Sequence, residues 1–288
     1  MSARRRIPSA RHRRTKGLKP PMGEALRYAA FIRGLLVKFQ DRALPIILHG
    51  WEKNTVAFGH GKPLRADASE FRGQKLGALK LELEEVLDPN TITPEIEKFA
   101  AKISDKGKTE FKRVIGITSK ETGVAAKLRQ FQIDNISYIK SLAGKQIQDI
   151  DAILVDAEAG AWRVEDLSEK LVHSFGVTQS KADLLARDQT LSLNGQLTQI
   201  RQTNAGITQY VWTTSNDERV RPTHQDLEGT VQSWASPPEV SDDGRTGHPG
   251  EDFQCRCTAF PILDELGGAD SALENLRSNP AARPSQDE

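Results

Sequence analysis

Apolar residues in the first half of the chain recur at steps of three and four positions, the period of an amphipathic α-helix. One such run begins near Glu24, and Pro45 is expected to end it, because proline interrupts the helical hydrogen-bond ladder. Further helices are predicted over residues 71–87, from Thr93 and Pro94 onward, and over 128–160. Residues 50–78 show a mixed pattern, and their first part is predicted to be a loop.

The pattern changes after Arg163. A short helix is predicted to end at Gly176, and a longer one should run from about Ser180 until Gly206 stops it. The segments ITQYVWTT and CTAFPIL then have the β-branched and aromatic content of strands. About 40 residues rich in Asp, Pro, Gly and Ser lie between them, and loops of this length are usually functional or held by something.

These patterns together predict an α+β protein. Its N-terminal half is mainly helical, and its C-terminal module has a long helix packed on a small antiparallel sheet. The expected divisions are a disordered basic arm over residues 1–22, a helical region over 23–160, a C-terminal module over 161–265 and a flexible polar tail over 266–288.

The formal net charge of +1 hides an uneven distribution. The first 19 residues contain no acid, so the remaining chain is clearly acidic. Because this arm has almost no large apolar side chains, burial cannot offset the entropy cost of ordering it. A solvated tail is one interpretation, and salt-sensitive contact with nucleic acid phosphates is the other. The candidate contacts are Arg4, Arg5, Arg6, Arg11, Arg13, Arg14, Lys16 and Lys19.

No segment reaches the roughly 18 to 20 apolar residues that a membrane span requires, and no apolar stretch follows the basic arm as in a signal peptide. The sequence therefore predicts no membrane association and an intracellular setting in which thiols stay reduced. A disulfide between Cys255 and Cys257 would enclose a single residue and be strained.

Four residues of the long loop could bind a metal ion: His224, His248, Cys255 and Cys257. Zinc favours four ligands drawn from thiolate and imidazole, and two cysteines at i and i+2 of a strand point to the same face. A structural zinc site is thus one hypothesis, although C-x-C is a weaker signal than C-x2-C. Two small buried hydrophobic residues and a catalytic thiol beside a histidine are the alternatives.

A second dense patch, NDERVRPTHQDLEG, could do acid–base chemistry, because it places carboxylates beside a histidine. Such patches are more often ordered turns in which Arg and Asp side chains satisfy backbone groups. The sequence therefore favours binding over catalysis, and no catalytic residue is assigned.

The motifs of this region resemble those of the phage Mu gpF-like minor head proteins. The resemblance is carried by WTTSNDERVRPTHQDLEGTV, SPPEV and GHPGEDFQCRCTAFPIL, and it extends upstream through FGVTQSKADLLARDQT to DNISYIKSL. Several separated motifs occur in the right order over roughly residues 130–264. The residues expected to organise the loop are Asp217, Arg219, Arg221, Pro222, His224, Gly229, Pro249, Gly250, Cys255, Arg256 and Cys257.

The resemblance implies a minor capsid protein of a phage or prophage, associated with the portal vertex. It would act in head morphogenesis, with a link to DNA packaging or ejection, after synthesis in the bacterial cytoplasm and incorporation into the virion head. Its partners would be the portal protein, other head proteins and packaged DNA near the basic arm.

One departure from the family bears on the metal hypothesis. Some relatives have C-P-x-C where this chain has Arg221, Pro222, Thr223 and His224, so an arginine stands in place of a possible thiolate. Two alternatives remain open: a metal-dependent hydrolase or nuclease using His224, His248, Cys255 and Cys257, and a DNA-binding protein that acts through its arm.

Overall fold

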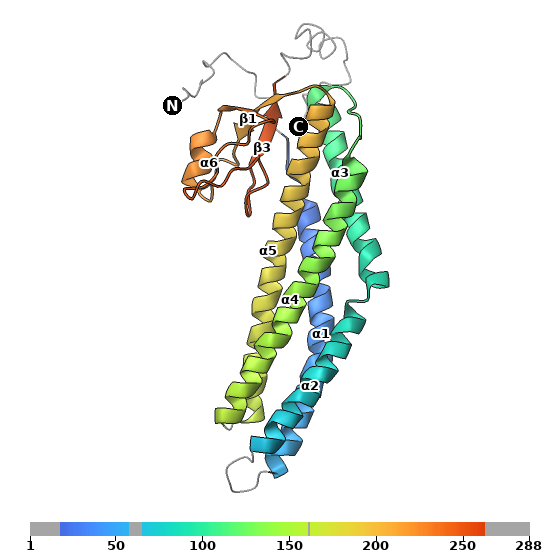
Figure 1. Ribbon diagram of the computed structural model, residues 1–288, viewed down its shortest axis with the longest axis vertical. Helices are drawn as coiled ribbons and strands as arrows, with labels where there is room; N and C mark the ends of the chain where they lie inside the picture. The colour runs from blue at the N-terminus through green and yellow to red at the C-terminus, as the bar shows by residue number, and fades with distance from the viewer. Residues whose placement is uncertain (1–17, 58–64, 161, 263–288) are drawn as a thin grey trace, which may run out of the picture. The chain divides into compact units, whose positions relative to one another are not determined.

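A computed structural model describes residues 18–57, 65–160 and 162–262 (Figure 1). The described elements are α1 Met22–Ala57, α2 Arg65–Val86, α3 Pro89–Ile115, α4 Val124–Gly160, α5 Val164–Asn204, β1 Gln209–Thr213, α6 Pro222–Leu227, β2 Val231–Ser233 and β3 Thr258–Pro261. This is the predicted α+β class, with a helical N-terminal half and a small antiparallel sheet near the C-terminus. None of the described helices is long and apolar enough to cross a membrane.

The chain forms two compact units. The helical unit comprises residues 26–97 and 132–186, and the sheet unit comprises the described residues up to 25, residues 98–131 and those from 187 onward. The predicted boundaries at residues 22, 160 and 265 stay predictions. Lys16 and the other basic residues before it lie outside the described residues, whereas Leu18 is buried and the Lys19 N–H donates to Glu110.

The helical unit shows where local signals mislead. Pro45 was expected to end the first helix, yet α1 continues to Ala57 with Pro45 inside it. Ile47 and Trp51, which follow the proline, are buried in the core of the unit. Their burial offsets the cost of one missing backbone hydrogen bond. The loop predicted for the first part of residues 50–78 is also wrong where the structure describes it, since α1 continues to Ala57 and α2 begins at Arg65.

Helix α5 is continuous, although a break was predicted between Gly176 and Ser180. Its buried positions Leu171, Phe175 and Ala182 continue through the glycine, so one apolar face spans the expected break. Phe175 packs edge-on against Phe39 of α1, with ring centroids 6.0 Å apart. A single glycine costs only about 1 kcal/mol in a helix, which this packing overcomes. Helix α3 likewise begins at Pro89, before the predicted Thr93.

The sheet has the strand order β2-β1-β3, and both pairings are antiparallel. Both predicted strands are present, and β1 is central because its Val211 faces Val231 on one side and Phe260 on the other. The intervening segment is not structureless as expected, since it contains α6 and β2. A core beneath the sheet is made by Tyr210, Trp212, Leu227, Trp234, Val240, Cys255, Cys257 and Ala259.

The end of α5 packs on this sheet through one buried amide. The Gln202 Nε2 group donates to the Ala259 carbonyl of β3 at 2.9 Å, and its Oε1 accepts from the Trp234 indole N–H at 3.0 Å. Gln202 is fully buried, so both ends of the amide must be satisfied inside the protein. Gly206, with φ +82°, stops the helix as predicted and turns the chain toward β1.

Candidate functional site: a clamped loop with a thiol–imidazole cluster

Helix α6 carries His224 into the interior. Pro222 occupies its first turn, where a missing N–H costs nothing, and Arg221 precedes it in an extended conformation. The side chains of His224 and Leu227 both point inward, and only 2% of His224 is exposed. The Trp212 ring meets the imidazole edge-on, with 5.6 Å between ring centroids, which fixes the plane of the histidine.

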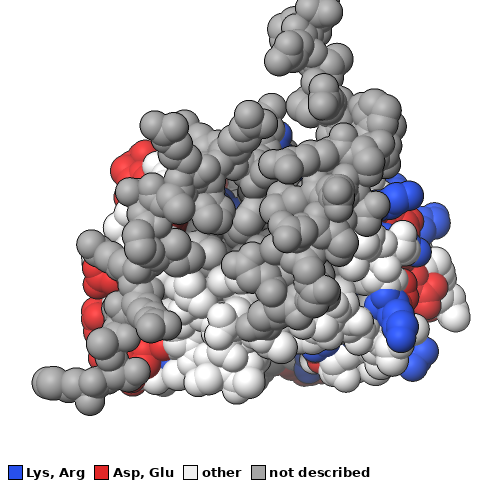
Figure 2. All heavy atoms as spheres, turned by 90° about the horizontal axis from the view of Figure 1, so that it is seen from above, with Lys and Arg blue, Asp and Glu red and all other residues white. Residues whose placement is uncertain are grey.

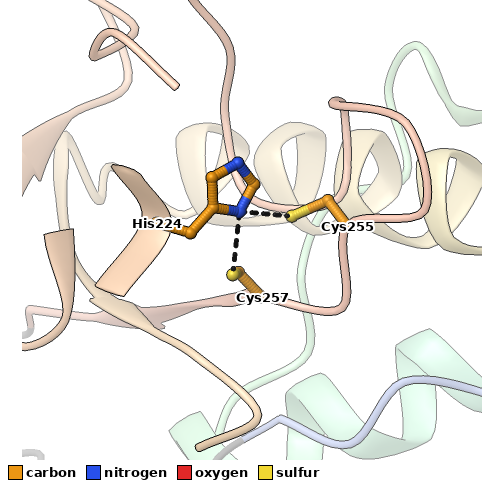
Figure 3. Close-up of side chains that lie close together, drawn as sticks. All are labelled: His224, Cys255 and Cys257. Atoms are coloured by element: carbon orange, nitrogen blue, oxygen red, sulfur yellow. Dashed lines mark hydrogen bonds between the residues drawn. The ribbon is translucent and has the colours of Figure 1, made fainter. Parts of the chain in front are cut away.

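The two cysteines approach the same imidazole from the segment that leads into β3. Cys257 Sγ lies 3.5 Å and Cys255 Sγ 3.6 Å from His224 Nδ1. Dashed lines mark both contacts in Figure 3. The nitrogen and the two sulfur atoms lie within 4.8 Å of one another, and all three side chains are buried. Both cysteines are free thiols. We call these three residues the thiol–imidazole cluster.

Asp252 lies on the other side of the imidazole. Its Oδ2 is 3.3 Å from His224 Nε2 and 2.8 Å from Arg221 Nη1. Its Oδ1 is 2.8 Å from Arg245 Nη1. The Asp252 side chain is only 4% exposed, and two guanidinium groups balance its charge in that setting.

The surroundings shift the pKa values of the two cysteines in opposite directions. A hydrogen bond from Cys257, together with those from His224 and the Gly250 N–H, lowers the pKa of Cys255 to about 5. The same hydrogen bond to Cys255, with burial, raises the pKa of Cys257. Burial lowers the pKa of His224, but its hydrogen bond to Cys255 and the nearby negative charges outweigh this and leave the pKa raised.

His248 does not belong to this cluster among the described residues, although it was one of four proposed metal ligands. Its Nδ1 shares a hydrogen bond of 2.9 Å with the Tyr210 hydroxyl, and its ring packs against Trp234 at 4.8 Å. Burial lowers the pKa of His248, so the ring is neutral near pH 7. His248 is therefore a core residue, and the candidate ligand set narrows to three.

The segments 217–229 and 248–257 contact each other, as the sequence predicted. The Asp217 carboxylate forms a two-pronged ion pair with Arg256, and the Arg219 N–H also donates to this carboxylate at 3.1 Å. Arg221 joins Asp252 and the Phe253 carbonyl. These charge-assisted bonds clamp the long loop against the approach to β3.

Three of the residues expected to organise the loop act through the backbone. Gly229 has φ +70° and donates its N–H to the Trp212 carbonyl at 2.9 Å. Gly250 has φ +91° and donates its N–H to Cys255 Sγ at 3.4 Å. The Pro249 carbonyl would lie 2.4 Å from a Cβ at Gly195 of α5, so only glycine permits this approach.

A cavity of about 160 Å³ borders the thiol–imidazole cluster. The lining includes the three clustered residues together with Arg187, Arg219, Arg221 and Arg256. Arg256 and Arg221 are held by the aspartates named above, whereas 72% of the Arg219 side chain is exposed and its Nε lies 3.9 Å from the exposed Glu218 carboxylate. The four arginines of the lining outnumber its acidic side chains, so the opening has a positive rim.

A second, larger hollow beside α6 has the opposite character. Its volume is about 610 Å³, and its lining includes Asp226, Glu239, Asp242 and Asp243. Figure 2 shows acidic side chains gathered along the left edge of the viewed face, the side on which α6 lies in Figure 1. This edge of the module repels phosphate groups.

Several residues that hold the site were not predicted. Asp188 of α5 accepts the Gln254 N–H at 2.6 Å and so supports a residue with φ +56°. Asp252, Gly195 and Gln202 were also missed. Each of these four residues acts through a contact with a residue more than 30 positions away along the chain. In the sequence alone, each looks like an ordinary helix or loop residue. The i+2 spacing of the cysteines was the one local signal pointing to the cluster.

The fold and the clamped loop define an α+β module. In this module a long helix supports a three-stranded sheet and a loop that ion pairs hold in place. Residues 144–260 match the family described as Phage Mu protein F like protein, which confirms the resemblance given by the motifs. This part of the chain, less than half of its length, is therefore similar to the proteins of that family.

A curated relative, an uncharacterized protein of Haemophilus influenzae (strain ATCC 51907 / DSM 11121 / KW20 / Rd), is 34% identical over 141 residues. The match covers 49% of this chain and 30% of the relative, so the chain spans about a third of that protein. No solved structure matches the chain.

Proposed function

We propose that this protein is a minor head protein that docks at the portal vertex during head morphogenesis. The observation that carries this proposal is the family match over residues 144–260, which includes the whole clamped loop and the helix that supports it. The proposed partners are the portal protein and other head proteins, and the proposed locations are the bacterial cytoplasm during assembly and then the virion head.

The contacts in the loop support binding over catalysis. A hydrolase or nuclease would need a carboxylate able to position water or a metal-bound nucleophile. Asp217 is held by Arg256, and Asp252 by Arg221 and Arg245. Their charges are used to fix the shape of the loop, which is what a docking surface requires.

The portal proposal predicts co-assembly. The tagged protein, expressed with the portal protein of the same phage or prophage, should co-purify with it in a defined ratio by size exclusion. An Asp217→Asn, Arg256→Gln double variant should lower the recovered complex at least about tenfold if the clamped loop forms the contact, since the loop without this ion pair is no longer held in its docking shape.

A conservative change on the exposed face of the helical unit, such as Lys80→Gln, serves as the control and should leave recovery unchanged. Normal folding of both variants is checked by circular dichroism. Failure of the wild-type protein to co-assemble would contradict the portal role. If the double variant were recovered with the portal protein as well as the wild type is, the clamped loop would not be the contact surface.

DNA contact through the basic arm is a second proposal, and it is favoured by the charge distribution. Because the module has an acidic edge, attraction to packaged DNA would come from the arm. Most of the arm lies outside the described residues. Deleting residues 2–17 removes seven Lys and Arg side chains and keeps Leu18 and Lys19, which are part of the sheet unit. The slope of log affinity against log salt for duplex DNA should then become much shallower. An unchanged slope would remove the arm from DNA binding.

A further inference from the structure

We propose that His224, Cys255 and Cys257 bind one Zn²⁺ ion, with His224 Nδ1 and the two Sγ atoms as ligands. The site goes beyond the docking function, since it concerns what holds the loop in shape. Thiolate and imidazole are common ligands of zinc in proteins, and all three side chains are buried with their ligand atoms within 4.8 Å of one another.

The distances fit a single ion. With a Zn–S bond of about 2.3 Å, a Zn–N bond of about 2.0–2.1 Å and tetrahedral angles, a sulfur and a nitrogen ligand lie about 3.5 Å apart. The observed separations from His224 Nδ1 are 3.5 Å to Cys257 Sγ and 3.6 Å to Cys255 Sγ. Figure 3 shows both sulfur atoms directed at the same ring nitrogen. Both nitrogen-to-sulfur separations therefore match those expected for ligands of one tetrahedral ion.

The surroundings match those of a metal-bound histidine. When one ring nitrogen binds zinc, the other usually donates its hydrogen to a carboxylate or carbonyl, which orients the ring. Asp252 Oδ2 lies 3.3 Å from His224 Nε2, which is buried and makes no hydrogen bond in this structure, so this carboxylate is the nearest candidate acceptor once the ring is held by the ion. The Gly250 N–H, 3.4 Å from Cys255 Sγ, similarly supports a thiolate.

The charges of the ligands also balance the charge of the proposed ion. Two thiolates neutralise Zn²⁺, and a neutral imidazole adds no charge. Arg221, which could have repelled a cation, is instead bonded to Asp252 and the Phe253 carbonyl. Arg256 is paired with Asp217 in the same way. The arginines thus balance the carboxylates that surround the ligands.

A zinc ion here would join α6 to the segment before β3, closing a loop of some thirty residues. Because all three ligands line the cavity of about 160 Å³, the fourth position of a tetrahedral ion would face it. Water, or a small anion drawn by the positive rim, would fill that position. The rival interpretation is a hydrogen-bonded thiol pair with no metal.

The test is metal analysis of the full-length protein, purified under reducing conditions. We expect one zinc per chain by elemental analysis. Metal-free protein prepared with a chelator should take up one equivalent of Co²⁺, with thiolate-to-cobalt absorption and the intense visible bands of tetrahedral geometry, and Zn²⁺ should displace it. No zinc in the purified protein and no cobalt spectrum on titration would overturn the proposal.

Variants identify the ligands. Cys255→Ser and His224→Gln should each lower zinc affinity more than about 100-fold, and Asp252→Asn about 10–100-fold, the range for residues that orient a ligand. His248→Gln is the matched control, because it alters a buried histidine of the same module outside the cluster, and it should retain the metal. Metal loss in His248→Gln with retention in His224→Gln would contradict the assignment. Because a ligand variant could unfold, wild-type stoichiometry remains the primary measurement.

Discussion

Replacing Arg201 with methionine is expected to lower the free energy of unfolding by about 3 kcal/mol or more. Only 1% of the Arg201 side chain is exposed, and its Nη2 bonds Ser104 Oγ at 2.8 Å and Glu121 Oε2 at 3.0 Å. Breaking a buried pair leaves its partner uncompensated, which typically costs about 3–5 kcal/mol. The lower end applies because Glu121 is 31% exposed. Chemical denaturation measures the change.

The matched control for this prediction is Arg113→Met. Arg113 pairs with Glu110 on the surface of α3, 47% of its side chain is exposed, and such pairs contribute roughly 0–1 kcal/mol. Equal losses of unfolding free energy in the two variants would show that the burial of Arg201 does not contribute to stability.

Gly107 packs against the Arg201 guanidinium, since a Cβ at Gly107 would lie 2.7 Å from Arg201 Nη1.

The same ion pair should depend on pH. Burial raises the pKa of Glu121, but its hydrogen bonds from Arg201 and Ser119 outweigh this and leave the pKa below the ordinary value. The contribution of Glu121 is therefore fully present above the unfolded-state pKa of about 4.3 and is lost as the pH falls further. The difference in stability between the wild type and Arg201→Met should shrink in that acid range.

Replacing Trp212 with alanine should lower the free energy of unfolding by about 3–5 kcal/mol, the usual cost of emptying a large aromatic site. Trp212 is fully buried on the central strand β1, and its backbone N–H donates to the Thr230 carbonyl at 2.9 Å. Its ring also sets the plane of His224. The loss should appear in equilibrium denaturation followed by circular dichroism.

Two further variants make the Trp212 prediction specific. Trp212→Phe keeps an aromatic ring and leaves a smaller cavity, so it should cost clearly less than the alanine change. Phe253→Ala removes an aromatic ring that is 56% exposed in the clamped loop and should change stability by no more than about 0.5 kcal/mol. A loss in Phe253→Ala as large as that in Trp212→Ala would refute burial as the cause.

The sequence predicted those features whose signals are local. Apolar periodicity located most helices, and the β-branched and aromatic segments located β1 and β3. The predictions at Pro45 and Gly176 were wrong because a single helix-breaking residue costs less than the burial on either side stabilises. Such burial depends on contacts between distant segments, which no short window of sequence contains.

The same division between local signals and long-range contacts applies to the candidate site. The C-R-C motif and the two histidines of the long loop pointed to a cluster, and both segments of the loop were expected to meet. Which histidine would join the cysteines was not predictable, because His224 and His248 differ only in their surroundings. Tyr210 and Trp234 hold one of them, and the two cysteines meet the other.

The arrangement of the small sheet has a consequence for crowded assemblies. Its two outer strands, β2 and β3, have only three and four residues, and the Ala259 carbonyl on β3 is occupied by Gln202. Short or covered outer strands give neighbouring chains little backbone to pair with. Many copies held close together would thus resist stacking into fibre-like aggregates through this sheet.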